Sequence, residues 1–325
     1  MKESEFLVLV AAPLQALAAF EYLRSSPQNK YRLLVMTPEE ISGPRFQLLK
    51  TLEILDFKDA ILIPATPVKA LCFLLVRQFR LSLRLVFTTD FTVVIGDFRN
   101  RFMRLIGRIA GGKRVLIDDG LATLDAIYEI KKKEKTYQLG NREWTIFTCF
   151  FGNAVSKNIQ PNKLSHIAGL NKKSKVIDDQ QCWFLGGKMS ERGAIGLGDE
   201  LSLMHEINAY WANQGVALTY VAKRTSSEKK LEMLVGMGIE CKSFELPVEL
   251  ELLMRDHLPR YICSFGSSAT ATINHLYPEL VQTIIEIPAR LISPDLAVDR
   301  RLLRVAFRGN DKIRFVDTSG VAADL

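Results

Sequence analysis

The feature that most constrains this chain is the repeated alternation of short apolar runs with helical stretches. In its first third, apolar runs occur at 6–11, 31–36, 60–65, 92–97 and 114–118. Each of the first four is followed by a stretch with helical periodicity. Continuous apolar runs of this length are typical of parallel strands that helices cover on both faces. The first part of the chain is therefore predicted to be a doubly wound α/β domain.

A second series of the same kind follows a break in the pattern. Between about 125 and 180 the sequence contains a charge run at 131–135, an aromatic stretch at 145–152 and a linker-like stretch at 161–175. The expected strands and helices then resume at 182–187, 199–213, 216–223, 226–238, 240–246, 248–256, 260–268, 269–278 and 283–289. A chain of 325 residues suits two domains. We expect two Rossmann-like domains, 1–175 and 176–325, that face an interdomain cleft.

The composition indicates a cytoplasmic globular protein. Hydrophobic residues make up 48% of the chain and charged residues 24%. Acidic residues precede the first apolar run, and Pro13 and Gln15 interrupt it, which argues against a secretory signal. Apolar stretches fall short of the roughly 20 residues of a membrane-spanning helix. The five cysteines are widely spaced without a zinc-binding pattern, so we expect reduced thiols.

The net charge of +7 favours anionic partners. The basic residues lack interleaved aromatic residues and a recognised binding motif, so nucleic acid is not the expected partner. An anionic sugar nucleotide, an acidic glycan or the inner leaflet of a membrane would each fit the charge. The segment 73–87 is apolar with spaced arginines. This pattern fits either an amphipathic helix lying on lipid or a core-facing helix with a solvated edge.

Several common nucleotide and hydrolase motifs are absent from the sequence. Neither series has G-x-G-x-x-G after its first apolar run, and the chain contains no G-x-x-x-x-G-K-[ST]. These absences argue against dinucleotide oxidoreductases and P-loop phosphotransferases. G-x-S-x-G is also absent, which disfavours an α/β-hydrolase.

The sharpest polar cluster is Asp118, Asp119 and Gly120, where the apolar run 114–118 ends. Open α/β sheets bind ligands at the carboxyl ends of their strands. A carboxylate there can take a proton from an attacking hydroxyl, and a second carboxylate beside it raises its pKa. The structural alternative is that one aspartate caps the following helix.

Two further clusters follow apolar runs in the second half. The stretch 264–274, with Gly266, Ser267 and Ser268, fits a phosphate cradle at a helix start. The structural alternative to a phosphate site is that Ser267 only caps the following helix. Lys223 and Arg224 follow the strand expected at 216–223 and could neutralise a phosphate leaving group. The structural alternative for Lys223 and Arg224 is that they are two solvated surface cations without a ligand.

Gln15 and Arg99 follow two of the expected strands of the first domain and could face an acceptor. Their structural alternatives are a hydrogen bond at a helix N-terminus and a surface charge. The four histidines have no ligand spacing, so no metal site is expected.

The order of these motifs resembles bacterial sialyltransferases and polysialyltransferases of the GT-B type. That family carries an acidic D/E-D/E-G motif in its first domain, and a histidine motif and a serine pair in its second. This chain has DDG at 118–120 and SS at 267–268 in the same order. It is further similar to the polysialyltransferase-like group in APLQALAAFEY, GDFRNRFMR, VLIDDGLATL and TIFTCFF.

The resemblance implies an inverting transfer of sialic acid, or a related nonulosonic acid, from a CMP-activated donor to a hydroxyl of a cell-surface glycan. Asp118 would be the general base, and Asp119 would shape its loop. Lys223 stands where the family has a histidine, and its cation would stabilise the departing phosphate. The residues expected to bind the donor are Gly120, Lys223, Arg224, Gly266, Ser267 and Ser268.

The same resemblance places the acceptor glycan in the first domain, near Gln15 and Arg99, and the nucleotide sugar in the second. CMP has one phosphate, whose charge protein cations and amides can carry, so neither a metal nor another cofactor is expected. Peripheral contact with an anionic inner membrane would fit the basic charge.

Two other functions stay open at this point. The chain could be a GT-B transferase that uses another nucleotide sugar or a Kdo-type donor. It could also be a catalytically degenerate binding protein of glycan assembly, which the missing histidine would permit.

Overall fold

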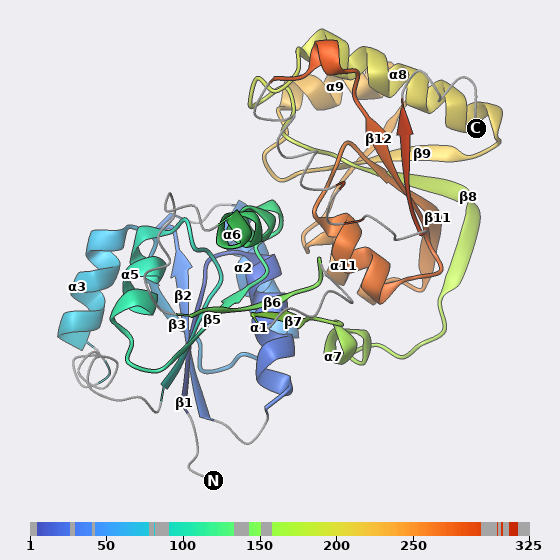
Figure 1. Cartoon of the computed structure of the whole chain (residues 1–325). Coiled ribbons are helices and arrows are strands. Elements are labelled where there is room, and N and C mark those ends of the chain that lie inside the picture. The colour runs from blue at the N-terminus through green and yellow to red at the C-terminus, as the bar shows by residue number, and fades with distance from the viewer. Residues whose placement is uncertain are drawn as a thin grey trace. The chain divides into compact units, whose positions relative to one another are not determined.

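The chain divides into two compact units, Met1–Leu170 (unit 1) and Asn171–Leu325 (unit 2). Each unit is an α/β domain built on its own parallel sheet (Figure 1). The prediction of two Rossmann-like domains is confirmed. The computed structural model describes residues 5–26, 30–40, 43–77, 81, 91–132, 143–150, 158–293, 304, 307 and 312–317.

The sheet of unit 1 has seven parallel strands in the order β3-β2-β1-β4-β5-β6-β7. They are β1 (Glu5–Val10), β2 (Lys30–Thr37), β3 (Ile61–Pro64), β4 (Phe91–Ile95), β5 (Lys113–Ile117), β6 (Thr145–Thr148) and β7 (Ile159–Pro161). Val8 pairs with Leu33 of β2 on one side and with Val94 of β4 on the other. The strand order therefore reverses beside β1, and the carboxyl ends of β1 and β4 form the topological switch point.

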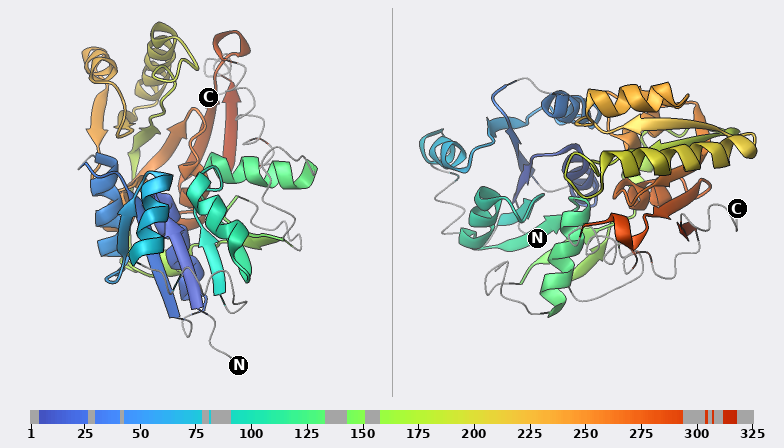
Figure 2. Two further views of the ribbon diagram at one scale, coloured as in Figure 1. Left: turned by 90° about the vertical axis from the view of Figure 1, so that its left-hand side faces the viewer. Right: turned by 90° about the horizontal axis from the view of Figure 1, so that it is seen from above.

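Helices cover both faces of this sheet (Figure 2). They are α1 (Pro13–Arg24), α2 (Gly43–Ile54), α3 (Pro67–Arg77), α5 (Arg101–Ile109), α6 (Leu121–Lys132) and α7 (Ser165–Ala168). Helix α1 packs against α2 and α7, while α3 packs beside α5. Leu74 of α3, Phe102 of α5 and Ala126 of α6 share one core with Leu7 and Val93 of the sheet. Burial on both faces explains why these strands are continuously apolar.

The sheet of unit 2 has six parallel strands in the order β10-β9-β8-β11-β12-β13. They are β8 (Val176–Leu185), β9 (Ala217–Ala222), β10 (Glu240–Ser243), β11 (His257–Ser264), β12 (Val281–Glu286) and β13 (Ile313–Asp317). The first strand of the unit, β8, is again flanked on both sides, because Cys182 pairs with Leu218 and with Tyr261. The switch point of unit 2 lies between β8 and β11.

Two separate cores lie on the two faces of the second sheet. Its helices are α8 (Leu197–Asn213), α9 (Glu228–Gly236), α10 (Val248–Met254), α11 (Ala269–Leu276) and the short 3-10 helix η2 (Ala289–Leu291). Met204 of α8 and Leu234 of α9 belong to one core. Leu252 of α10 and Ile273 of α11 belong to the other. Figure 1 shows α8 and α9 on one face of this sheet and α11 on the other.

The structure differs from the sequence expectation mainly between 125 and 180. The aromatic stretch contains β6, the linker-like stretch contains α7, and β7 ends where the linker-like stretch begins. Strands β6 and β7 extend the first sheet at its end. These elements have only three or four residues each, too few to give a periodic signal. Of the segment 73–87, α3 includes the part up to Arg77, and 78–80 and 82–87 lie outside the described residues. Among the described helices, none combines the length and apolar character that spanning a membrane requires.

Candidate functional site

Polar side chains gather in unit 1 where five neighbouring strands end. Gln15 follows β1, Asp97 follows β4, Asp119 follows β5, Cys149 follows β6 and Asn162 follows β7. Because all seven strands are parallel, these carboxyl ends lie along one edge of the sheet. This edge, beside the switch point, is where open α/β sheets bind ligands.

Gln15 connects the end of β1 with the acidic pair. Its side-chain Oε1 accepts a hydrogen bond of 2.7 Å from the backbone N–H of Ala11, and its Nε2 donates one of 2.7 Å to Oδ1 of Asp119. Gly96 leaves room for this side chain, since a Cβ at that position would lie 2.3 Å from Oε1 of Gln15. Gln15 is 2% exposed, so within this structure it positions Asp119.

Asp118 lies deeper than its neighbour. Its carboxylate is 1% exposed, and Oδ2 accepts hydrogen bonds from the backbone N–H of Cys149 (2.9 Å) and from Nδ2 of Asn162 (3.5 Å). These bonds run to the ends of β6 and β7 rather than to the helix that follows β5. Asp119 is partly exposed, and its backbone N–H donates to Oγ1 of Thr123 at 2.7 Å. The accessible carboxylate of the pair is therefore Asp119, and Gly120 makes the turn after it with a φ of 66°.

The surroundings raise the pKa of both carboxyl groups into the neutral range. Burial raises the pKa of Asp118 to about 6, against opposing hydrogen bonds from Thr148, Cys149 and Asn162. Burial also raises the pKa of Asp119 to about 7, and the charges of Asp97 and Asp118 act in the same direction. The hydrogen bond from Gln15 and the charge of Arg99 oppose this rise. A carboxyl group with such a pKa can take up or release a proton at neutral pH.

Arg99 lies beside the acidic pair without joining its hydrogen bonds. Its guanidinium forms an ion pair with Asp125 of α6, and its backbone N–H donates to Oδ1 of Asp97 at 2.7 Å. The Arg99 side chain is exposed and close enough to Asp119 to oppose the rise in its pKa. Its predicted contact with an acceptor stays a prediction, as does that of Gln15.

In unit 2 the turn after β11 satisfies most of its amides internally. Oγ of Ser264 accepts hydrogen bonds from the backbone N–H groups of Gly266 (3.1 Å) and Ser267 (3.0 Å). Oγ of Ser267 accepts from the N–H of Ala269 at 3.3 Å. Gly266 has a φ of 106°, which only glycine adopts readily. These internal hydrogen bonds weaken the interpretation of the stretch as an amide cradle, and the Ser267 hydroxyl takes part in one of them. Ligand binding by Gly266, Ser267 and Ser268 stays a prediction.

Four cations lie near the ends of β8 and β9. Lys223 and Arg224 follow β9, and Lys188 and Arg192 belong to the loop after β8. Partial desolvation, followed by the charges of Arg192, Lys188 and Arg224, lowers the pKa of Lys223. Charges that repel Lys223 strongly enough to lower its pKa lie near it, although Lys223 itself is exposed. We call Lys188, Arg192 and Lys223 the cation cluster.

Arg224 also interacts with an acidic group of unit 2. Desolvation lowers its pKa, and the buried carboxylate of Glu249 opposes this effect. Glu249 accepts a hydrogen bond of 2.8 Å from Oγ1 of Thr272. Part of the Arg224 charge is therefore balanced within the fold.

Sequence reasoning missed Lys188 and Arg192. Both lie in GGKMSERG at 186–193, directly after the first strand of the second series. The same logic that selected Lys223, a cation after a buried strand, would have selected Lys188. Arg192 lies seven residues beyond Leu185, where β8 ends, so only the folded loop could reveal it.

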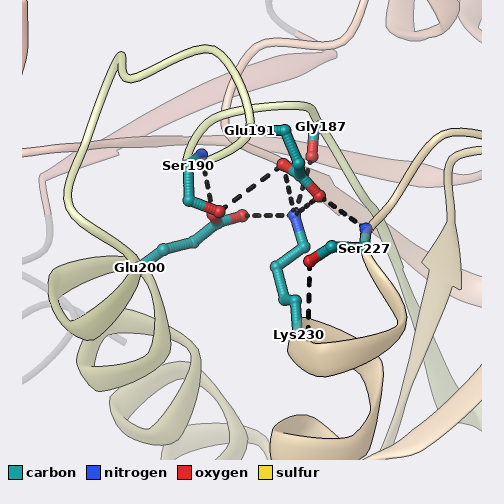
Figure 3. Close-up of polar contacts among 6 residues, drawn as sticks. All are labelled: Gly187, Ser190, Glu191, Glu200, Ser227 and Lys230. Carbon is teal, nitrogen blue, oxygen red and sulfur yellow. Dashed lines mark hydrogen bonds and ion pairs between the residues drawn. The ribbon is translucent and has the colours of Figure 1, made fainter.

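A buried lysine fixes the loop that carries these two cations (Figure 3). Nζ of Lys230, on α9, donates to the carbonyl of Gly187 (3.1 Å), to Glu191 (3.0 Å) and to Glu200 on α8 (3.1 Å). Lys230 is 0% exposed and Glu200 is 1% exposed. Burial alone lowers the pKa of Lys230, but Tyr220 and the two glutamates outweigh it and raise that pKa.

Backbone groups complete this arrangement. Oε2 of Glu200 accepts from the N–H of Ser190 (3.0 Å), and Oε1 of Glu191 accepts from the N–H of Ser227 (3.0 Å). The ends of the β8–α8 loop and the start of α9 are thus joined by charged hydrogen bonds. We call Lys230 and its two carboxylate partners, the buried Glu200 and the more exposed Glu191, the buried ion cluster.

In the part of the chain that the structure describes, no group of three or more His, Cys, Asp or Glu side chains could hold a metal ion. The expectation that the reaction needs neither a metal nor another cofactor stays a prediction.

No protein-family model matches the chain, and no curated protein sequence matches it. Solved structures do match its fold. A UDP-GlcNAc 2-epimerase from Methanocaldococcus jannaschii, in complex with UDP-GlcNAc and UDP, has 12% identity over 97% of this chain and 89% of its own, with a TM-score of 0.54. A UDP-GlcNAc 2-epimerase from Neisseria meningitidis, bound to UDP-GlcNAc, has 11% identity over 98% and 89%, with a TM-score of 0.52.

A third similar structure is UGT2 of Phytolacca americana, complexed with UDP-2-fluoro-glucose and pterostilbene. It has 10% identity over 99% of this chain and 89% of its own, with a TM-score of 0.53. The chain has the GT-B fold. At these identities the likeness is one of fold.

The expectation of a sialyltransferase that uses a CMP-activated sugar is wrong. The similar structures are UDP-GlcNAc 2-epimerases and a UDP-sugar-binding protein, and neither a family model nor a curated sequence supports a sialyltransferase. The error has a physical reason. Short motifs of acidic residues, glycine and serine are common in the loops that connect a parallel strand to the next helix. DDG and SS therefore indicate such loops and do not specify which nucleotide is bound.

Proposed function

We propose that this protein is a UDP-sugar-dependent glycosyltransferase. The observation that carries the proposal is a contrast between the strand ends of the two units. Unit 1 holds a carboxyl pair with pKa values of about 6 and 7, and unit 2 holds the cation cluster. A base for an acceptor hydroxyl and cations for a diphosphate are the two elements that such a transfer needs.

In the proposed reaction Asp119 is the general base. Its carboxylate takes the proton of the acceptor hydroxyl while the hydroxyl oxygen attacks the anomeric carbon of the sugar. The bond between that carbon and the UDP oxygen breaks, UDP leaves with the electron pair, and the configuration inverts. Asp118 raises the pKa of Asp119, and Gln15 holds its carboxylate in place.

The cation cluster is proposed to bind the diphosphate of UDP. Lys188, Arg192 and Lys223 would stabilise the charge that develops on the leaving group. Ser267 and Ser268 would add hydroxyl contacts at the start of α11. The similar structures with UDP or UDP-sugars support a nucleotide sugar as the ligand class.

A second candidate function is epimerisation of a UDP-sugar. Two carboxyl groups with pKa values near neutrality could remove a proton from a sugar carbon and return one. Two of the similar structures are UDP-GlcNAc 2-epimerases, which supports this alternative.

Calorimetric titration with UDP, UDP-GlcNAc, UDP-glucose and CMP tests the ligand class. We expect UDP and at least one UDP-sugar to bind, and we expect replacement of Lys188, Arg192 and Lys223 by alanine to weaken UDP binding by at least about tenfold. Lys229→Ala, at an exposed lysine of α9, is the matched control and should leave binding unchanged. If neither UDP nor any UDP-sugar binds, the proposal fails.

Product analysis then separates the two activities. Incubation with a bound UDP-sugar in the absence of an acceptor, followed by NMR, detects an epimerised sugar. Release of UDP only in the presence of an acceptor, with a new glycoside, supports transfer. An epimerised UDP-sugar without a glycoside would replace the first candidate by the second.

A further inference from the structure

Helix α3 exposes apolar side chains where a surface helix normally carries polar ones. Val68, Leu75 and Val76 are 74%, 50% and 79% exposed, while Ala70 and Leu74 on the other face are buried in the core of unit 1. The exposed positions follow helical spacing, so they form one stripe. A helix that is apolar on all sides is normally buried, and the outer stripe of α3 therefore indicates an interaction surface.

Helix α5, which packs beside α3, also exposes apolar side chains. Leu105 and Ile109 are 40% and 38% exposed, and the arginines 101, 104 and 108 lie at the same helical spacing around them. Phe102, on the opposite side of α5, is buried in the core. We call Val68, Leu75, Val76, Arg101, Arg104, Leu105, Arg108 and Ile109 the α3–α5 surface; all of them are exposed except Arg104, which is half-buried.

The charge of these two helices has one sign. The sequences PVKALCFLLVR of α3 and RFMRLIGRI of α5 contain Lys69, Arg77 and three further arginines and not one Asp or Glu. Lys69 forms an ion pair with Glu39, outside both helices. The partner that this surface fits must combine an apolar layer with negative charge.

Unit 2 offers a comparison within the same molecule. Helix α9 exposes Val235 to 58% and Met233 to 41%, but its sequence EKKLEMLVG mixes Glu228 and Glu232 with its lysines. Exposed apolar residues are therefore found elsewhere, whereas the combination with purely basic charge distinguishes α3 and α5.

We propose that the α3–α5 surface docks on an anionic lipid bilayer. Valine, leucine and isoleucine would enter the interface between headgroups and acyl chains, and the arginines around them would meet the negative headgroups. An acidic protein would satisfy the arginines but would leave the apolar stripe without a matching layer. This inference is independent of the proposed enzymatic function, since it uses none of the site residues.

Sedimentation with vesicles tests the proposal. The full chain is mixed with vesicles of phosphatidylcholine alone or of equal parts phosphatidylcholine and phosphatidylglycerol. We expect binding to the second kind that weakens as salt is added. Val76→Glu should reduce this binding by about tenfold, because it removes apolar contact and adds a repelled charge. Replacing Arg101 and Arg104 by glutamine should reduce it by about fivefold for each residue.

Val235→Glu is the matched control, since it makes the same change at an exposed valine of unit 2. It should bind vesicles like the wild type.

Val76 is 79% exposed, so Val76→Glu should fold, which circular dichroism checks. Val68→Glu is a second variant of the same stripe. Three results would overturn the proposal: no sedimentation of the wild type with anionic vesicles at low salt, equal losses for Val76→Glu and Val235→Glu, or self-association of the protein alone that Val76→Glu abolishes.

Discussion

The two sheets share a topology but differ in the residues that follow their strands. In both, the first strand of the unit is flanked by strands on either side, and polar side chains follow the strands beside the switch point. Unit 1 has carboxylates and neutral amides at these strand ends, and unit 2 has lysines and arginines after β8 and β9 and a glycine–serine turn after β11. The common scaffold thus fixes where a ligand can be bound, and a few loop residues decide the sign of the charge that it meets.

The units also differ in whether a buried ionisable side chain has a partner of opposite charge. Lys230 of unit 2 is surrounded by two glutamates and a carbonyl, so its charge is balanced within the fold. Asp118 of unit 1 has hydrogen bonds only from neutral groups, and burial raises its pKa. A paired charge of this kind stabilises a loop, while the unbalanced carboxyl group of Asp118 raises the pKa of Asp119, the accessible carboxyl group beside it.

The strongest test of this contrast removes the cation of the buried ion cluster. Lys230→Met would leave Glu200 and Glu191 without their partner, and we expect the free energy of unfolding of unit 2 to fall by about 3–5 kcal/mol. Urea unfolding followed by the fluorescence of Trp183 and Trp211 measures it. Lys229→Met, at the exposed neighbouring lysine, should change it by less than about 0.5 kcal/mol. Equal stability of both variants would show that the cluster does not hold the loop.

The corresponding test in unit 1 concerns turnover. Asp119→Asn keeps the shape of the side chain and its hydrogen bond from Gln15 but removes the base. We expect kcat to fall by about 100-fold or more, with UDP affinity unchanged. The pH profile of kcat should lose its limb near pH 7, because the pKa of Asp119 is about 7.

A retained kcat in Asp119→Asn would assign the base elsewhere. Asp118→Asn is the comparison for this case, since the sequence alone favoured Asp118 for that role. If the pH profile of kcat lost its limb near pH 7 in Asp118→Asn and kept it in Asp119→Asn, Asp118 would be the general base and Asp119 the carboxyl group that raises its pKa.

A smaller effect is expected from Gly96→Ala. Its Cβ would lie 2.3 Å from Oε1 of Gln15, so the side chain must turn away from Asp119. We expect a loss of about 1–3 kcal/mol in the stability of unit 1 and a pKa of Asp119 above its present value, because the hydrogen bond that lowers it is lost. Thermal unfolding and the pH profile of kcat measure the two effects.

Gly198→Ala in helix α8 is the control for this substitution. No atom lies within 4 Å of a Cβ there, so the change should stabilise unit 2 by about 0.5–1 kcal/mol. An unchanged pH profile in Gly96→Ala would mean that Gln15 does not set the pKa of Asp119.

A further expected effect is a pH dependence of stability with opposite sign in the two units. In unit 1 the folded pKa of Asp118, about 6, exceeds the unfolded value near 4, so the folded state binds its proton more tightly. Its contribution to stability is therefore present at low pH and lost as the pH rises through about 6. In unit 2 hydrogen bonds from Lys230 and two backbone N–H groups lower the pKa of Glu191, so its contribution is lost as the pH falls.

Urea unfolding at pH 5 and pH 8 measures this difference, with Trp144 as the probe of unit 1. Asp118→Asn should reduce the change in unit 1 between these pH values by about 1–3 kcal/mol and leave unit 2 unaffected. If the variant and the wild type changed equally, Asp118 would be ionised in the folded protein throughout this range.

Much of the fold could be predicted because its signals are local. Continuous apolar runs separated by helical periods identified five strands of unit 1 and five of unit 2. The runs at β6 and β7 are too short to be recognised, and they find their places only by pairing at the end of an existing sheet. Asp118, Asp119 and Lys223 were found in the same local way, as polar residues that follow a buried strand.

What the sequence determined by itself is therefore the class of fold and the kinds of residue at the strand ends, because both depend on the order of neighbouring residues. The tertiary structure decided which aspartate is accessible, that Gln15 holds it in place, and that Lys230 is buried between two glutamates. These properties depend on partners tens of residues away in the chain, since burial and charge balance arise only when distant segments pack together. The prediction of a CMP-activated donor was wrong for the same reason. A motif of three residues indicates a loop at the end of a strand, but the residues that distinguish one nucleotide from another come from distant parts of the chain.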